Sequence, residues 1–297
     1  MKYLSRAPQA NVAILWVVMR WLQKGPASYD DLTAAVRPAA LVSPADDAFN
    51  ATLVVAADIG LLGADGSNGE WRILEEASVS ADAFERPDRF RSLVRRALLQ
   101  RAVREHEAGG EPSDVAVGLA WLCSLDPSRP LLWGWDGDGG PEQTIQKLGL
   151  TDVIVNDTQW RAFRRWAIAL GFAAAGNPAP PPSTPPQRLI PDPTAAIADC
   201  LPQMPRSLSA RAFVDALAAE VPAVDGGALE MVLQERGLQY EARADAALGP
   251  AVGHALERLQ RRGALTLHKS DDAGQRVSYR IADQTRTFDF ISIGVRG

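Results

Sequence analysis

The feature that most constrains the fold is a pair of short segments near the C-terminus in which apolar and polar residues alternate. Residues 264–269 read Ala-Leu-Thr-Leu-His-Lys and residues 276–281 read Arg-Val-Ser-Tyr-Arg-Ile, with turn-forming residues between them. Successive side chains of a strand point to opposite faces of a sheet, so this alternation indicates strands with one buried face. The two segments therefore predict a β-hairpin.

Three helices are expected before this hairpin. The first is capped by Ser207 or Ser209 and runs to Glu220, and the others cover residues 227–236 and 249–262. Three helices followed by a hairpin is the order of a winged helix-turn-helix unit. We expect such a domain over residues 188–297. A further strand, at residues 288–293, is expected to extend the sheet or to offer an edge to a partner.

The first 75 residues repeat this order, which predicts a winged-helix-like domain over residues 1–75. Its apolar run, residues 12–19, is shorter than the ~20 residues that a membrane span needs. We therefore expect a core helix there, in a cytoplasmic protein that is neither secreted nor embedded in a membrane. The expected elements are helices at 10–23, at 29–36 with Ser28 as N-cap, and at 45–60, and a hairpin at 61–73.

Residues 76–176 form a helical domain in this interpretation, and residues 177–187 form a proline-rich linker. The fold class predicted for the chain of 297 residues is mainly α with small β-hairpins, or α+β. The helices expected in the middle domain are 87–107, 113–124, 141–148 and 157–173.

The overall charge is acidic, with a formal net charge of −5 and a pI of about 5.3. Since dedicated nucleic-acid binders are more often basic, any contact with DNA must come from a local patch. Residues 258–280 carry six cations and two acids, on the third helix and hairpin that winged helices place on DNA. The candidate DNA-binding residues there are Arg258, Arg261, Arg262, Lys269, Arg276 and Arg280.

A second basic block covers residues 86–104, with seven arginines and one acid. Arginine binds phosphate with two parallel hydrogen bonds, so Arg89, Arg95 and Arg96 are further candidates for contact with a DNA backbone. The alternative is a solvated helix face whose arginines pair with acids elsewhere, because acidic residues flank the block.

The sequence contains no recognisable enzyme site. The three histidines, His106, His254 and His268, have no metal-ligand spacing, and the phosphate-loop and nucleophile-elbow motifs are absent. The two cysteines, Cys123 and Cys200, are expected to be buried thiols in a reducing compartment. We therefore expect a non-catalytic protein without cofactor or metal.

Binding to other proteins is expected at two places. The third N-terminal helix, at 45–60, contains three acids and no lysine or arginine, so DNA would repel it and a protein is the better partner. Trp133 and Trp135 lie in a glycine-rich loop and are candidate anchors for a partner protein.

Two short motifs, Asn11-Val12-Ala13-Ile14-Leu15-Trp16 and Leu189-Ile190-Pro191-Asp192-Pro193-Thr194-Ala195-Ala196, resemble those of DpdG-type accessory proteins. Such proteins are associated with bacterial gene clusters that insert 7-deazaguanine derivatives into DNA and restrict unmodified DNA. The resemblance implies a cytoplasmic role in phage or plasmid defence, as a non-catalytic member of a complex.

The first hypothesis is therefore an adaptor subunit of a DNA-modification or phage-defence system that contacts both DNA and other proteins. A homodimeric winged-helix transcriptional regulator is the second hypothesis, and predicts half-sites about one helical turn apart. The third is a protein-interaction scaffold without nucleic-acid contact, which the acidic pI favours.

Overall fold

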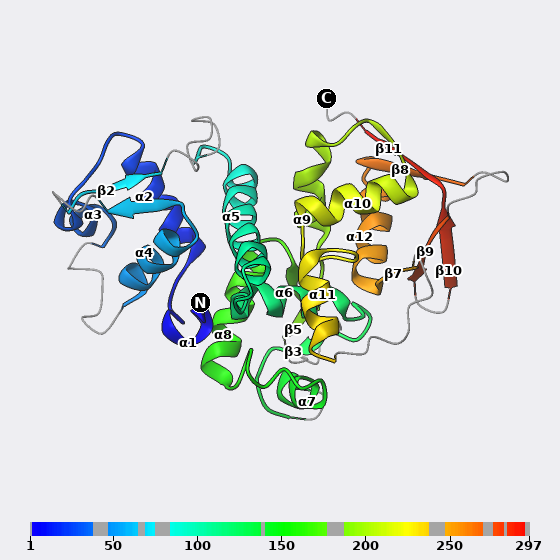
Figure 1. Cartoon of the computed structure of the whole chain (residues 1–297), viewed down its shortest axis with the longest axis horizontal. Coiled ribbons are helices and arrows are strands. Elements are labelled where there is room, and N and C mark those ends of the chain that lie inside the picture. The colour runs from blue at the N-terminus through cyan, green and yellow to red at the C-terminus, as the bar shows by residue number, and fades with distance from the viewer. Residues whose placement is uncertain are drawn as a thin grey trace, which may run out of the picture.

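The computed structural model describes residues 2–37, 47–64, 69–74, 84–137, 140–176, 187–237, 247–269, 276–281 and 284–294. The fold is mixed α/β, with small sheets among many helices (Figure 1). An N-terminal unit and a C-terminal unit lie on opposite sides of the long helix α5 (Pro87–Glu107). No described helix is both long enough and apolar enough to cross a membrane.

The N-terminal unit has the predicted order of three helices and a hairpin. The Ser28 hydroxyl accepts a hydrogen bond from the Asp31 N–H at the start of the second helix, as expected for an N-cap. Ala27 forms an isolated antiparallel bridge with Trp71 of the hairpin. The elements are α2 (Val12–Leu22), α3 (Tyr29–Val36), α4 (Ala48–Asp58), β1 (Leu62–Ala64) and β2 (Trp71–Ile73).

The helix at the centre of the molecule is α6 (Asp114–Ser124), in which every residue from Asp114 to Cys123 is buried. A helix that is apolar on all sides needs cover on all sides. The short α1 (Tyr3–Arg6) and α8 (Asp157–Ala169) pack against it, together with α5 and with two helices of the C-terminal unit.

A three-stranded sheet joins segments on either side of the proline-rich stretch, most of which, residues 177–186, lies outside the described residues. The central strand, β5 (Arg188–Pro191), pairs antiparallel with β3 (Leu131–Leu132) and with β4 (Ala173–Gly176). The division into domains at residues 177–187 stays a prediction, but backbone pairing crosses it. The remaining elements of this region are α7 (Pro141–Lys147), α9 (Thr194–Cys200) and a 3₁₀ turn at Leu201–Gln203.

The C-terminal unit contains the predicted helices as α10 (Ala210–Glu220), α11 (Ala228–Glu235) and α12 (Pro250–Arg261), and Ser209 caps the first. Its nearby strands form two sheets, in the orders β6-β11-β8 and β10-β9-β7. Their bounds are β6 (Ser207–Ser209), β7 (Ala247–Leu248), β8 (Leu265–His268), β9 (Val277–Ile281), β10 (Gln284–Phe288) and β11 (Phe290–Ile293).

The prediction that residues 264–269 and 276–281 pair with each other is wrong. β8 pairs with β11, whereas β9 pairs antiparallel with β10 and parallel with β7. The suggestion that residues 288–293 offer an edge is also wrong for β11, because it lies between β6 and β8. Alternation identifies the buried face of a strand correctly here, but it carries no information about the strand's neighbour.

Candidate nucleic-acid interface

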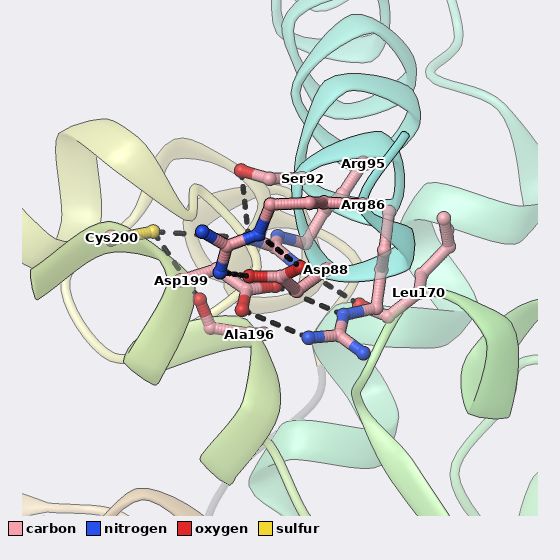
Figure 2. A network of polar contacts seen from close by, with 9 residues as sticks. Arg86, Asp88, Ser92, Arg95, Leu170, Ala196, Asp199 and Cys200 are labelled. Carbon is pink, nitrogen blue, oxygen red and sulfur yellow. Dashed lines mark hydrogen bonds and ion pairs between the residues drawn. The ribbon is translucent and has the colours of Figure 1, made fainter. Parts of the chain in front are cut away.

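The arginines of α5 are largely used inside the molecule. The Arg91 guanidinium donates two hydrogen bonds to Asp199 of α9, at 2.9 Å and 2.8 Å. Nη1 of Arg95 lies 3.1 Å from the same carboxylate. Figure 2 shows Arg95, Asp199 and Cys200 converging where α5 meets α9. The acid that pairs with these arginines thus comes from beyond the proline-rich stretch.

Arg95 is not available to DNA, so its assignment as a phosphate contact is wrong. Its side chain is 2% exposed, and its guanidinium also donates to the Leu170 carbonyl at 3.2 Å and to the Ser92 hydroxyl at 3.3 Å. The thiol of Cys200 lies 4.0 Å from Nη2, and burial raises the pKa of that thiol. A charge held in this way stabilises the contact between α5 and α9.

The other arginines of α5 are closer to solvent. Arg96 is half-exposed and pairs with Glu220 at 2.8 Å, which reduces its attraction for a phosphate. Arg101 pairs with Glu105 at 3.2 Å. Glu105 is one of the acids that flank the block, so this pair agrees with the alternative interpretation, in which the arginines pair with acids. Arg89 is exposed. Most arginines of this block are therefore paired with acids of the same chain, as the structural alternative predicts.

Helix α12 is buried over most of its surface. Seven of its residues are buried, and it packs against α6, α9, β8 and β9. Arg258, on its partly exposed side, forms an ion pair with Asp192. A helix enters the major groove only if a full face is free. The side of α12 that is left, at Pro250, His254 and Arg258, is only partly exposed, and Arg258 on it is already paired, so it offers little for reading bases.

Exposed cations remain at the C-terminal end of α12 and on the strands. Arg261, Arg262, Lys269 and Arg280 are all exposed. Among the described residues, none of these four side chains has a hydrogen bond or an ion pair. Arg276 differs, because its Nε donates to the buried Asp289 at 3.2 Å.

One further exposed cation, Arg206, was missed by sequence reasoning. Its carbonyl accepts a 2.8 Å hydrogen bond from the Ile293 N–H, and Ile293 pairs with Leu265 just after α12. Arg206 therefore approaches the same end of the sheet as Arg262. Only the pairing of β6 with β11 brings these distant segments together, and no local sequence signal indicates it.

The two tryptophans of the glycine-rich loop are half-buried and pack against the core. The Trp133 carbonyl accepts a hydrogen bond from the Trp160 indole at 2.9 Å, and the Arg164 guanidinium lies 4.1 Å from the centre of the Trp133 ring. Arg164 is itself 8% exposed. These contacts direct Trp133 inward, so a role as a partner anchor has little support there. For Trp135 it stays a prediction.

A different apolar surface is exposed on the N-terminal unit. Ala13, Val17, Arg20, Trp21 and Lys24 are exposed at helical spacing along and just beyond α2, and we call this surface the α2 face. Val17 is 50% and Trp21 is 39% exposed, and the Lys24 ammonium lies 4.8 Å from the centre of the Trp21 ring. The sequence predicted a core helix here. One side of α2 is buried as predicted, and the α2 face is exposed.

The described residues contain no group of three or more histidines, cysteines or acids that could hold a metal ion. His106 lies 3.7 Å from Glu235, and Nε2 of His268 lies 2.9 Å from the Ser292 hydroxyl. Burial lowers the pKa of His254. Each histidine therefore has a separate local environment, far from a shared centre.

No curated protein and no solved structure matches the chain. The model of one protein family, described as DpdG-like, matches residues 1–273. This match covers the N-terminal unit, the central helices and most of the C-terminal unit. The chain therefore belongs to the DpdG-like family.

Proposed function

We propose that this chain is a non-catalytic adaptor subunit of a bacterial DNA-modification and phage-defence system, and that its C-terminal unit contacts the DNA backbone. Membership of the DpdG-like family supports a role in a DNA-modification system. The adaptor role and the contact with DNA are argued from the surface of the protein.

The observation that supports DNA contact is the difference between two groups of cations. On α5, Arg91, Arg95 and Arg96 are held in ion pairs with acids of the same chain. At the end of α12 and just after β8, the side chains of Arg261, Arg262 and Lys269 are exposed and have no ion pair within the described part of the chain. Unpaired surface cations release counterions when they meet phosphate, which is the main source of affinity for DNA.

The order of elements in each unit supports its assignment as a winged helix-turn-helix. In the C-terminal unit, α10, α11 and α12 are followed by β8 and β11, with β6 alongside. Because α12 is covered, we expect phosphate contacts rather than base reading. The burial of α12 also argues against a sequence-specific homodimeric regulator.

The adaptor role is supported by the α2 face. Exposed tryptophan surrounded by smaller apolar residues is a common energetic centre of protein interfaces. The α2 helix carries no acid, and its exposed cations, Arg20 and Lys24, favour a partner surface with negative charge. The N-terminal unit would thus bind protein while the C-terminal unit binds DNA.

The test of DNA contact is a fluorescence-anisotropy titration against random duplex DNA at about 50 and about 200 mM salt. With three phosphate contacts, affinity should fall about 40-fold over this range. Arg261→Glu with Arg262→Glu should weaken binding at low salt by at least tenfold. Arg20→Glu with Lys24→Glu makes the same change in net charge on the α2 face and should bind like the wild type.

No binding of the wild type at low salt would refute the DNA contact and leave the interaction scaffold as the better hypothesis. Equal losses in both charge-reversed variants would show that net charge alone, rather than the end of α12, governs the interaction.

A further inference from the structure

We infer that the antiparallel pair of strands β9 and β10, which we call the ribbon, rather than helix α12, is the part of the C-terminal unit that lies against duplex DNA. The inference rests on the proposed function and specifies which surface carries it. The ribbon lies at the periphery of the C-terminal unit, on the side away from α5 (Figure 1).

The outer face of the ribbon is set by its register. Arg280 is paired with Thr285, and Ser278 is paired with Thr287. Directly paired residues of antiparallel strands have side chains on the same face. Arg280 and Thr285 are exposed and the other two are half-buried, so all four belong to the face that meets solvent.

The inner face fixes the ribbon on α12. Val277, Tyr279 and Phe288 are buried, and the Tyr279 and Phe288 rings lie 6.1 Å apart. At Gly253, α12 approaches so closely that an added Cβ would lie 3.0 Å from the Tyr279 ring. The ribbon is therefore packed directly on the helix that it covers.

A buried carboxylate strengthens this attachment. Glu257 of α12 accepts hydrogen bonds from the Tyr279 hydroxyl at 2.7 Å and from the Arg286 guanidinium at 2.5 Å. Burial alone would raise the pKa of Glu257, but these two hydrogen bonds and the charge of Arg286 lower it. The ribbon thus presents a fixed outer face, which limits the entropy lost when a ligand binds it.

The chemistry of the outer face suits a phosphate backbone. It offers one guanidinium and three hydroxyls, which are common donors to phosphate oxygens. Among the described residues of the ribbon, at 276–281 and 284–288, there is no acid. Asp283, which follows β9 in the sequence, lies outside the described residues. Neighbouring β7 places Ala247 beside Ser278, which adds no charge.

The shape of the ribbon also suits a duplex. The major groove is about 12 Å wide and accepts either a helix or a two-stranded β-ribbon. The free side of α12 is narrow and only partly exposed, whereas β9 and β10 pair over five residues each and the third strand, β7, pairs only with Ser278 and Tyr279, so the ribbon has the more suitable shape. Exposed Lys269 follows His268, whose carbonyl accepts a 2.9 Å hydrogen bond from the Asp289 N–H just after β10, so Lys269 would supply an additional contact to a phosphate outside the groove.

The experiment compares two variants of the full chain that change net charge equally. Arg280→Glu with Thr285→Glu alters the outer face of the ribbon, and Arg104→Glu with Gln100→Glu alters exposed positions of α5. We expect the ribbon variant to bind random duplex DNA at least tenfold more weakly at about 50 mM salt, and the α5 variant to bind like the wild type. Circular dichroism on heating checks that both variants remain folded.

A second measurement does not depend on charge reversal. Cys123 and Cys200 are buried, so an environment-sensitive fluorophore can be attached selectively to Thr285→Cys or to the control Gln100→Cys. Addition of duplex DNA should change the emission of the label at position 285 and leave that at position 100 unchanged.

The outcomes separate this inference from the proposed function. If the wild type binds DNA and Arg261→Glu with Arg262→Glu weakens binding, but both ribbon measurements match the wild type and control, the ribbon assignment is wrong and DNA contact stands. Absence of wild-type binding refutes both. Weakened binding of the ribbon variant, with a response at position 285, supports the ribbon as the contact surface.

Discussion

Arg91 and Asp199 are joined by two hydrogen bonds, from Nε to Oδ2 at 2.9 Å and from Nη2 to Oδ1 at 2.8 Å. The pair connects α5 with α9, whose sequences are separated by the proline-rich stretch. Asp199 also forms an ion pair with Arg95, so one carboxylate balances the charge of two guanidinium groups at a buried contact between helices.

Asp199→Asn should strongly destabilise the protein, because Arg95 would keep its charge in a buried position without a carboxylate. Loss of one partner of a buried ion pair costs about 3–5 kcal/mol of unfolding free energy. Asp88→Asn is the matched control, since its pair with Arg86 is exposed and worth at most about 1 kcal/mol. Urea unfolding measures both. Similar losses in the two variants would contradict the structural role of Asp199.

Gly171→Ala should destabilise the fold more than Gly149→Ala. Both glycines follow a helix and have positive φ, +82° and +70°, so both substitutions carry the cost of a left-handed alanine, about 1–2 kcal/mol. Only at Gly171 would the added Cβ meet α9, at 3.0 Å from Ala195 Cβ and 3.2 Å from Ala196 N. Thermal unfolding should therefore show a lower midpoint for Gly171→Ala. Equal midpoints would mean that α9 shifts without cost.

Asp114 should make the stability of the protein depend on pH. Burial raises its pKa to about 6, although its carboxylate accepts hydrogen bonds from the N–H groups of Tyr3, Leu4 and Val115. The folded chain therefore keeps this proton to higher pH than the unfolded chain. The contribution to the free energy of unfolding is full below about pH 4 and is lost as pH rises through about 6.

Asp114→Asn removes this titration and is the reference for measuring it. The free energy of unfolding of the wild type, relative to the variant, should fall by roughly 2–3 kcal/mol between about pH 4 and pH 6.5. Urea unfolding at a series of pH values measures the difference. A relative rise over this interval would place the pKa of Asp114 below its ordinary value.

The α2 face predicts a contrast between adjacent residues. Val17 is 50% exposed and Val18 is fully buried, so Val17→Asp should change the free energy of unfolding by at most about 0.5 kcal/mol, whereas Val18→Asp should cost more than about 4 kcal/mol. Thermal unfolding tests this contrast. If the adaptor role is correct, Val17→Asp should also reduce co-purification with other proteins of the modification system while leaving DNA affinity unchanged.

The sequence was most informative about helices, because their signals are local. The α5 bounds, Pro87–Glu107, agree with the prediction, and the caps Ser28 and Ser209 each act on an N–H group three residues away. The short strands β3, β4 and β5 were missed, since two to four residues of a buried sheet give little periodicity.

The candidate site was predicted less well, because charge patterns do not specify their partners. Seven arginines at residues 86–104 suggested a phosphate surface, but Asp199 and Glu220, more than 100 residues further on, pair with three of them. In the C-terminal unit, Arg261, Arg262, Lys269 and Arg280 are exposed, and their contact with DNA stays a prediction. The covering of α12 by β9 depends on a strand order that alternation cannot reveal.

The position of α6 has a consequence for the folding of the chain during its synthesis on the ribosome. Its apolar surface emerges about 100 residues before α11 and α12, the helices that complete its cover, have been synthesised. Likewise β3 and β4 must wait for β5 to arrive between them. The nascent chain therefore carries an incompletely covered apolar helix and an unfinished sheet through a long part of translation, an interval in which chaperones would protect it from aggregation.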